Sequence, residues 1–180
     1  MIRLLKKLNM LFYFKSPFYN LVLNNNIDEK IQSNPESLWS GNKANGIKII
    51  DGFLNYQKES VFIDENLWKK NHGSQSWNSY VNSFMWIPDV RAVGTNQARL
   101  FLRKKIIDWI DHIDYSNPLI WNHDVLAKRI FYLLTNLSFF FETANENFQK
   151  KFAKNINKQC VVLHRRSKNQ NKNIFTIKSL

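Results

Sequence analysis

Two short stretches of the sequence place a tryptophan shortly before an arginine: Trp86 before Arg91, and Trp121 before Arg129. Indole rings stack on the apolar faces of sugar rings, and guanidinium groups bind carboxylates or sulfates through paired hydrogen bonds. Both stretches fall near the expected ends of helices, where side chains can face a shared cleft. The sequence therefore predicts an acidic-polysaccharide site whose substrate-binding residues are Trp86, Arg91, Trp121 and Arg129.

The same residue types have a structural interpretation, which stays open at this point. Tryptophans of a helical domain mostly serve as core or loop anchors, and Asp89 can pair with Arg91 to hold a joint between helices. Asp124 is expected as the N-cap of the helix that follows it, rather than as an acid. Asn122 and His123, in the loop that leads into that helix, are second choices for the cleft.

Other common chemistries lack the residues that they need. The four histidines are not paired at helical spacing with one another, and no Cys-x-x-Cys occurs; His164 follows Cys160 by four residues, but two such residues alone do not make a metal site, so none is predicted. The five glycines are spread over the chain and form no phosphate-binding loop, and no Gly-x-Ser-x-Gly nucleophile motif is present. Cys160 stands among apolar positions and is expected as a small packing residue. No cofactor is predicted, and the catalytic residues stay unidentified.

The composition also limits the partners. The chain of 180 residues has a formal net charge of +12, which usually raises nucleic acid as a partner. The basic residues, however, are mostly lysines scattered through every segment, and heavy use of Asn, Lys and Ile indicates compositional drift. Nucleic-acid binding is therefore not predicted.

Residues 1–15 are expected to form an amphipathic segment with leucines on one face. Polar residues interrupt its apolar run and no small-x-small cleavage site follows, so no signal peptide is predicted. The segment is also too short and too charged to cross a bilayer, and no transmembrane segment is predicted. A cytoplasmic location is favoured over a periplasmic one.

The rest of the pattern predicts a mainly α fold with one small β hairpin near its start. The runs Ile47–Tyr56 and Val61–Ile63 indicate short strands around a turn. After about residue 76, apolar residues recur at steps of three and four and predict amphipathic helices joined by short loops. One of them is expected after Thr95 as N-cap, and another from residue 124 to 141. Thr143 and Glu146 have the spacing of a capping box that opens the last helix.

Several motifs occur in an order that strongly resembles the N-terminal part of bacterial heparinase II/III-like proteins. The resemblance extends from about residue 16 to residue 166, and the order and spacing of the motifs carry it. In chain order they are Leu38-Trp39-Ser40-Gly41 with Gly46; Ile49-Ile50-Asp51-Gly52-Phe53; Trp86-Ile87-Pro88-Asp89-Val90-Arg91-Ala92; Ile107-Asp108-Trp109-Ile110; Trp121-Asn122-His123-Asp124 followed by Arg129; and Val162-Leu163-His164.

This resemblance implies an (α/α) toroid of helical hairpins followed by a β-sandwich domain, with polysaccharide lyase activity. In such lyases a base removes the proton next to a uronate carboxylate, whose charge polar groups or a metal neutralise, and a donor such as tyrosine assists the leaving glycosidic oxygen. The expected fold is a partial (α/α) toroid, which as an incomplete arc should expose apolar surface at the end of its last helix. Pro88 departs from the family pattern and predicts a sharper break in the chain.

In the resembled family, the catalytic Asn or His and Tyr lie further along the toroid than residue 180. The expected organisation is an amphipathic segment over residues 1–15, the N-terminal part of the toroid over residues 16–166, and a polar, disordered tail over residues 167–180. The sequence thus predicts the N-terminal fragment of a lyase that acts on uronate-containing polysaccharide by β-elimination, inactive without the missing C-terminal part of the same protein. The alternative is a noncatalytic helical module that binds an anionic glycan or a partner protein.

Overall fold

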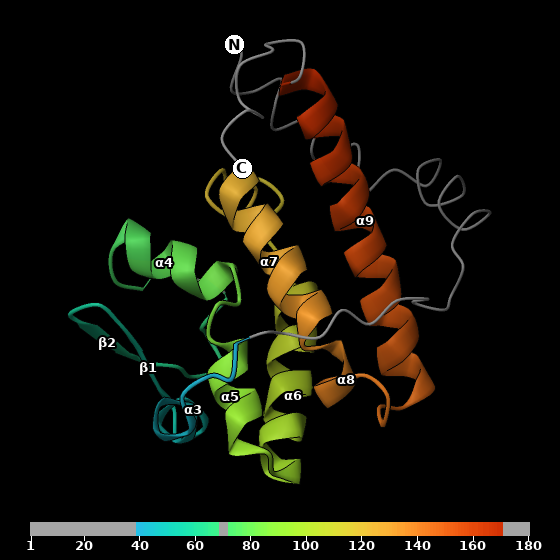
Figure 1. The fold of residues 1–180 in the computed structure, drawn as a ribbon. Helices are drawn as coiled ribbons and strands as arrows, with labels where there is room; N and C mark the ends of the chain where they lie inside the picture. The colour runs from blue at the N-terminus through green and yellow to red at the C-terminus, as the bar shows by residue number, and fades with distance from the viewer. Residues whose placement is uncertain (1–38, 69–71, 171–180) are drawn as a thin grey trace.

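The computed structural model describes residues 39–68 and 72–170. In this part of the chain, seven helices and one antiparallel two-stranded hairpin confirm the predicted mainly α fold. The long helices α6, α7 and α9 alternate in direction, and α9 packs against both of the others (Figure 1). The elements are α3 (Lys43–Ile50), β1 (Phe53–Tyr56), β2 (Glu59–Phe62), α4 (Gln75–Asn82), α5 (Ile87–Val93), α6 (Asn96–His112), α7 (His123–Thr135), α8 (Leu137–Phe140) and α9 (Glu146–Gln170).

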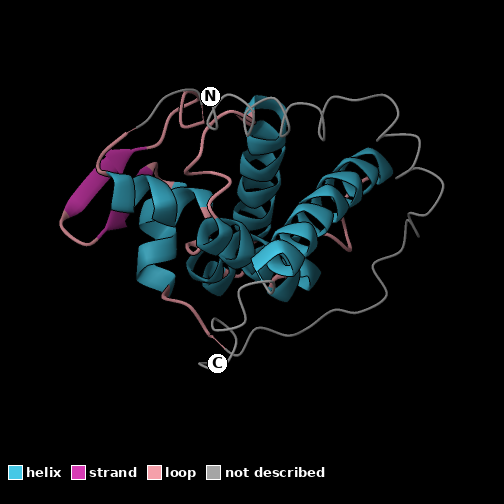
Figure 2. Cartoon of the chain, turned by 90° about the horizontal axis from the view of Figure 1, so that it is seen from above, coloured by secondary structure: helices cyan, strands magenta, loops and turns pink. Residues whose placement is uncertain are grey.

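The β hairpin lies at one edge of the helices (Figures 1 and 2). Phe53 of β1 pairs with Phe62 of β2, and Leu54 pairs with Val61. Because successive side chains of a strand point to opposite faces, Leu54 enters the core while Phe53 and Phe62 stay exposed. The hairpin is therefore anchored by one face only.

The predicted strand Ile47–Tyr56 is wrong in its first half, because that half belongs to helix α3. The side chain of Asn42 caps α3 by accepting a hydrogen bond from the backbone N–H of Asn45 at 3.0 Å. A short run of β-branched residues favours a strand locally, but the packing of α3 against α5 overrides this preference. The chain turns at Gly52, with φ 99°, before it enters β1.

The break that Pro88 predicts is present, but it comes before the proline. Helix α4 is followed by Ser83, then Phe84 adopts φ 56°, and α5 begins at Ile87. Pro88 lies in the first turn of α5, where a missing N–H removes no helical hydrogen bond. The joint therefore contains a short helix that the sequence pattern did not predict.

The N-cap of α6 is as predicted, and the N-cap of α7 is not. Thr95 caps α6 through a hydrogen bond from the backbone N–H of Ala98 at 3.2 Å. The N-cap of α7 is Asn122, whose Oδ1 accepts from the N–H of Asp124 at 3.0 Å. Asp124 instead pairs with Lys128, so its prediction as the N-cap is wrong.

Helix α7 ends at Thr135, before the predicted end at Phe141. Asn136 is completely buried, and its Nδ2 donates to the backbone oxygen of Tyr132 at 2.8 Å. Such local bonds from an asparagine side chain compete with the helical hydrogen bonds and favour termination. The remaining predicted residues form the separate short helix α8.

Helix α9 begins at Glu146, but not through the predicted capping box. The Oδ1 of Asn145 accepts from the backbone N–H of Phe148 at 2.9 Å, which is the bond that a cap provides. The hydroxyl of Thr143 instead accepts from Arg103 Nη2 at 2.7 Å. The threonine thus fastens the loop to α6 rather than capping α9.

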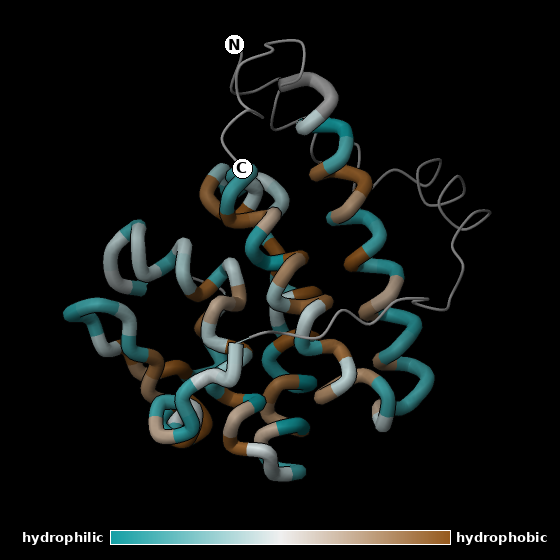
Figure 3. The backbone as a smooth tube through the Cα atoms, in the orientation of Figure 1, coloured by the Kyte–Doolittle hydropathy of each residue, from teal (hydrophilic) through white to brown (hydrophobic). Residues whose placement is uncertain are grey.

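The expectation of exposed apolar surface at the end of the last helix is wrong for the described side chains. Outward positions of α9 carry polar residues such as Lys154 and His164, and hydropathy alternates along the helix (Figure 3). Cys160 is half-buried, and burial raises the pKa of its thiol. The large exposed apolar side chains of the described residues lie elsewhere: Trp39, Ile47, Phe53, Phe62, Leu100 and Phe131.

The structure describes the ends of the chain only in part. Helix α9 continues to Gln170, so residues 167–170 of the predicted polar tail are helical. The predicted amphipathic segment 1–15 and residues 171–180 lie outside the described residues. Among the residues that are described, none of the helices has the length and apolarity to span a membrane.

Candidate functional site

Arg129 lies at the centre of the helical core, with no solvent exposure. Its Nε donates to Gln159 Oε1 at 2.6 Å. Its Nη1 donates to the backbone oxygens of Asn82 at 2.9 Å and Ile120 at 3.1 Å. The guanidinium group therefore joins α7 to α9, to the last residue of α4 and to the loop before α7.

Two tryptophans enclose the same guanidinium group. The Arg129 Cζ atom lies 4.5 Å from the ring centroid of Trp109 and 5.4 Å from that of Trp121, which is the geometry of a cation–π contact. Among the described residues, Arg129 Nη2 has no hydrogen-bond partner. Burial lowers the pKa of Arg129 to about 9, so the group stays protonated at neutral pH.

The two predicted site tryptophans are also enclosed. Trp86 has no exposure, and its Nε1 donates to the backbone oxygen of Val81 at 3.2 Å. Trp121 is buried, stacks on Tyr115 with centroids 5.8 Å apart, and donates to the backbone oxygen of Asp114 at 3.2 Å. Both indole N–H groups are thus satisfied inside the protein, as buried tryptophans require.

Arg91 and Asp89 do not form the ion pair that one interpretation predicted. Asp89 accepts from the backbone N–H of Asn42 at 2.7 Å and from Asn45 Nδ2 at 2.5 Å, so it holds the start of α3 against α5. Arg91 donates to the backbone oxygen of Trp39. The two side chains secure the same joint through separate contacts.

The four predicted substrate-binding residues do not line one surface. Trp86, Trp121 and Arg129 are buried, and only Arg91 is partly accessible. A polysaccharide on the described surface cannot reach the three buried side chains, whose contacts in this structure are packing contacts. Of the second choices, His123 Nε2 lies 3.3 Å from Ser167 Oγ, and Asn122 lines an open groove.

That groove runs between α4 and α7. Its larger part has a volume of about 660 Å³, and a smaller part of about 240 Å³ adjoins it. Ser79, Asp124 and Val125 line both parts, so the two form one groove. The other lining residues are Gly73, Gln75, Asn78, Pro118, Leu119 and Asn122 in the larger part, and Tyr56, Ser76, Tyr80, Ser83, Met85 and Lys128 in the smaller part.

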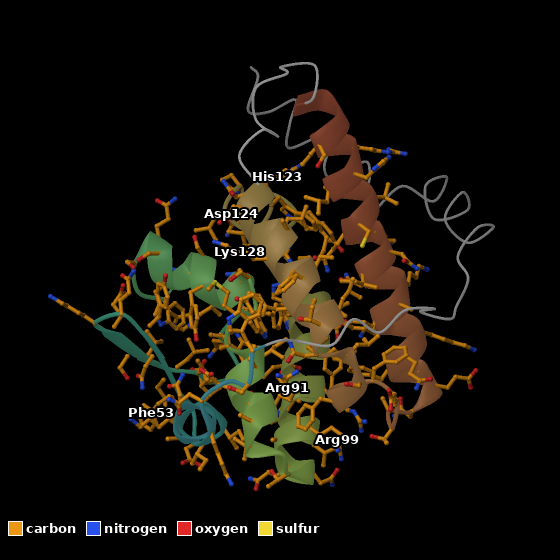
Figure 4. The ribbon with its side chains drawn as sticks, in the orientation of Figure 1. Phe53, Arg91, Arg99, His123, Asp124 and Lys128 are labelled. Carbon is orange, nitrogen blue, oxygen red and sulfur yellow. The ribbon has the colours of Figure 1, made fainter. Side chains whose placement is uncertain are left out.

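The lining includes the hydroxyl groups of Ser76, Ser79 and Tyr80 and the amide groups of Gln75 and Asn122, among apolar atoms that contribute more of its exposed area. The hydroxyl and amide groups both donate and accept hydrogen bonds, which suits a ligand rich in hydroxyls. Asp124 Oδ2 and Lys128 Nζ form an ion pair of 2.8 Å on the upper half of α7 (Figure 4). The rings of Tyr56 and Tyr80 stack with centroids 4.2 Å apart. Among the described lining residues, Lys128 supplies the positive charge that a carboxylate needs.

The sequence contained a signal for this groove, but a weak one. Asp124 and Lys128 stand four residues apart at the start of a helix, and Ser76 and Ser79 are accessible polar positions of α4, which buries its tryptophan. An ordinary solvated helix face shows the same spacing. Only the meeting of α4 with α7 shows that these residues share a groove.

Tyr80, a residue of the groove, makes the stability of the protein depend on pH. Burial, reinforced by Asp89, raises the pKa of its phenol. The folded state then holds this proton after the unfolded chain has lost it, so stability falls as pH rises above about 10. Arg129, whose pKa is lowered, makes stability rise over the same pH range. The effect of Tyr80 must therefore be measured as the difference between the wild type and a Tyr80 variant.

We expect the Tyr80→Phe variant to lose less stability than the wild type between pH 9 and pH 11. The difference in slope should approach about 1.4 kcal/mol per pH unit, the value for one proton. Urea unfolding at a series of pH values measures both slopes. Parallel curves for the two proteins would show that Tyr80 does not carry the effect.

Comparisons with known proteins give no relative. No family model, no curated protein and no solved structure matches this chain. Within the described residues there is also no group of three or more His, Cys, Asp or Glu side chains that could hold a metal ion.

Proposed function

We propose that this chain is the N-terminal portion of a heparinase II/III-like polysaccharide lyase, and that its groove binds a uronate-containing polysaccharide. Residues 16–166 then form an incomplete arc of an (α/α) toroid. The groove supplies binding, while the base and proton donor for β-elimination belong to the part of the toroid beyond residue 180. The observation that carries the proposal is that the motifs of the resemblance contact one another in space.

The first contact joins the motif around Gly46 to the motif around Asp89. A side-chain carbon added at Gly46 would lie only 2.1 Å from the backbone oxygen of Asp89, and one added at Gly41 would lie 2.1 Å from that of Pro88. Arg91 also donates to the backbone oxygen of Trp39. The two glycines therefore stand where two distant segments pack too closely for a side chain, and Arg91 adds a hydrogen bond between the same segments.

The second contact joins the motifs around Trp109 and Trp121. Both rings lie against the Arg129 guanidinium group, which itself belongs to the Trp121 motif. Motif residues that together specify one fold are expected to contact one another in that fold. This spatial agreement supports the resemblance, and it explains the motif residues as scaffold of the toroid.

The alternative function is a noncatalytic helical module that binds an anionic glycan. The groove favours it as a second candidate, because the described lining residues include no unpaired carboxylate that could act as a base. Asp124 is paired with Lys128, and burial raises the pKa of Tyr80. The two candidates share the binding step and differ in whether the completed protein cleaves.

We expect residues 1–180 to bind acidic polysaccharides such as alginate, polygalacturonate or heparan sulfate, and not neutral dextran. The Lys128→Gln variant should bind about tenfold more weakly, since it loses a charge-assisted hydrogen bond. Isothermal titration calorimetry measures both, at two salt concentrations, because screening weakens the charged contact. Lys150→Gln is the matched control: Lys150 forms an equivalent i,i+4 ion pair with Glu146 at 2.7 Å on α9.

Absence of binding to every acidic polymer, or an equal loss in the two lysine variants, would contradict the binding role. The same samples separate the two candidates when the ultraviolet absorbance of unsaturated uronate is followed. We expect none from residues 1–180 alone. Cleavage by a longer protein that contains this chain would support the lyase, and binding without cleavage in that protein would support the noncatalytic module.

A further inference from the structure

An exposed aromatic pair includes Phe131, which follows the groove residue Lys128 on α7. Trp39 is 59% exposed and Phe131 is 43% exposed. Their ring centroids are 6.0 Å apart with the planes at 77°, an edge-to-face contact. Four of the other described tryptophans are buried and the fifth, Trp68, is half-buried, so Trp39 is placed differently from the rest.

The pair is connected to the rest of the protein through α7 and through α5. Phe131 follows Lys128 by three positions on α7, and residues at this spacing lie on the same helix face. Trp39 is fixed from the opposite side by Arg91 of α5, through its backbone oxygen. In Figure 4, Asp124 and Lys128 lie on α7, and Arg91 lies below them on α5. Neither ring lines the groove itself, so the pair lies beside the groove, next to Lys128.

We propose that Trp39 and Phe131 form a stacking subsite for one sugar ring of a uronate polymer whose neighbouring residues occupy the groove. This proposal rests on the proposed function. Exposed aromatic faces bind the apolar face of a pyranose without needing buried polar groups. Lys128, one helical turn away, lies where it can attract the carboxylate of the same ring or of the next one. The pair therefore selects a polymer over a single sugar.

A second exposed aromatic pair provides an internal control. Phe53 and Phe62 have ring centroids 5.4 Å apart, edge to face, and are 48% and 58% exposed. They belong to the hairpin, and Figure 4 shows Phe53 apart from Lys128 and Asp124. They match the proposed subsite in chemistry and exposure, but neither lies on α7 next to Lys128.

The test compares Trp39→Ala, Phe131→Ala and Phe62→Ala for binding of an alginate hexasaccharide and of a single uronic acid. We expect each of the first two changes to weaken hexasaccharide binding about tenfold, with little effect of the third. The hexasaccharide should also shield the wild type from quenching of tryptophan fluorescence by acrylamide, and Trp39→Phe should lose this shielding. Circular dichroism and Tm verify that each variant is folded.

The outcomes distinguish this proposal from the one on which it rests. If the wild type binds none of the acidic polymers, the binding function itself fails. If the wild type binds and Lys128→Gln weakens it, but the Trp39 and Phe131 variants behave like Phe62→Ala, then the groove is a binding site and the stacking subsite is refuted. Unchanged acrylamide quenching in the presence of bound hexasaccharide would refute it independently.

Discussion

Replacing Arg129 with alanine should lower the free energy of unfolding by about 3 to 5 kcal/mol, the largest effect that we expect from one substitution in this protein. The change leaves Gln159 Oε1 and the backbone oxygens of Asn82 and Ile120 without their buried donor. It also opens a cavity between the rings of Trp109 and Trp121. Urea unfolding followed by circular dichroism measures the loss.

Two further variants make this test specific. Arg129→Lys keeps a positive charge but cannot reach three acceptors from one flat group, so we expect it to recover less than half of the loss. Arg91→Ala removes a partly accessible arginine with one bond to a backbone oxygen and should cost about 1 kcal/mol. A loss below 1 kcal/mol for Arg129→Ala would show that the buried guanidinium group does not hold the helices together.

The ambiguity of Arg129 in the sequence has a physical origin. Stacking on indole rings and bonding to oxygen acceptors are what an arginine does in a sugar-binding cleft, and also what it does in a core. The deciding partners are Gln159 on α9 and the backbone of Asn82 on α4. Both are far from Arg129 in the chain, and no local spacing predicts them.

Helix α6 shows which features the sequence did predict. Thr95 is a strong N-cap, and Ala98, Leu102, Ile106 and Trp109 recur at helical spacing over several turns, all of them buried. Local propensity, capping and the spacing of apolar residues agree in this segment, so the sequence predicts the helix without knowledge of its distant contacts. The α7 boundary failed for the opposite reason, because the buried side chain of Asn136 ends a pattern that stays apolar beyond it.

The hairpin region shows a different limit. The run from Ile47 to Ile50 is short and rich in β-branched residues, and its helical state depends on α5, which lies about 40 residues later in the chain. Trp39 was part of a motif in the sequence, but its exposure beside Phe131 follows from the path of the backbone past Arg91. Exposure of an aromatic residue is a tertiary property, so the proposed stacking subsite required the structure.

The contact between α3 and α5 leads to the second large effect: Gly46→Ala should destabilise the protein by about 3 kcal/mol. In an exposed helix the same change would stabilise it by about 1 kcal/mol, since alanine is the better helix former. At Gly46, however, the new methyl group would lie 2.1 Å from the backbone oxygen of Asp89 and 2.8 Å from Val93 Cγ2. The two helices must therefore separate, which also strains the bonds from Asn45 and Asn42 to Asp89.

Gly94→Ala is the matched control for this steric argument. Nothing lies within 4 Å of a side-chain carbon at Gly94, so alanine there meets only the cost of its left-handed backbone, with φ 74°, of about 1 kcal/mol. Asn45→Ala separates the hydrogen bond from the packing, because it removes one donor to Asp89 and adds no atom at the interface. We expect urea unfolding to rank the losses with Gly46→Ala first. A Gly46→Ala protein as stable as the wild type would mean that α3 does not pack on α5 at this distance, and the contact between the two motifs would lose its support.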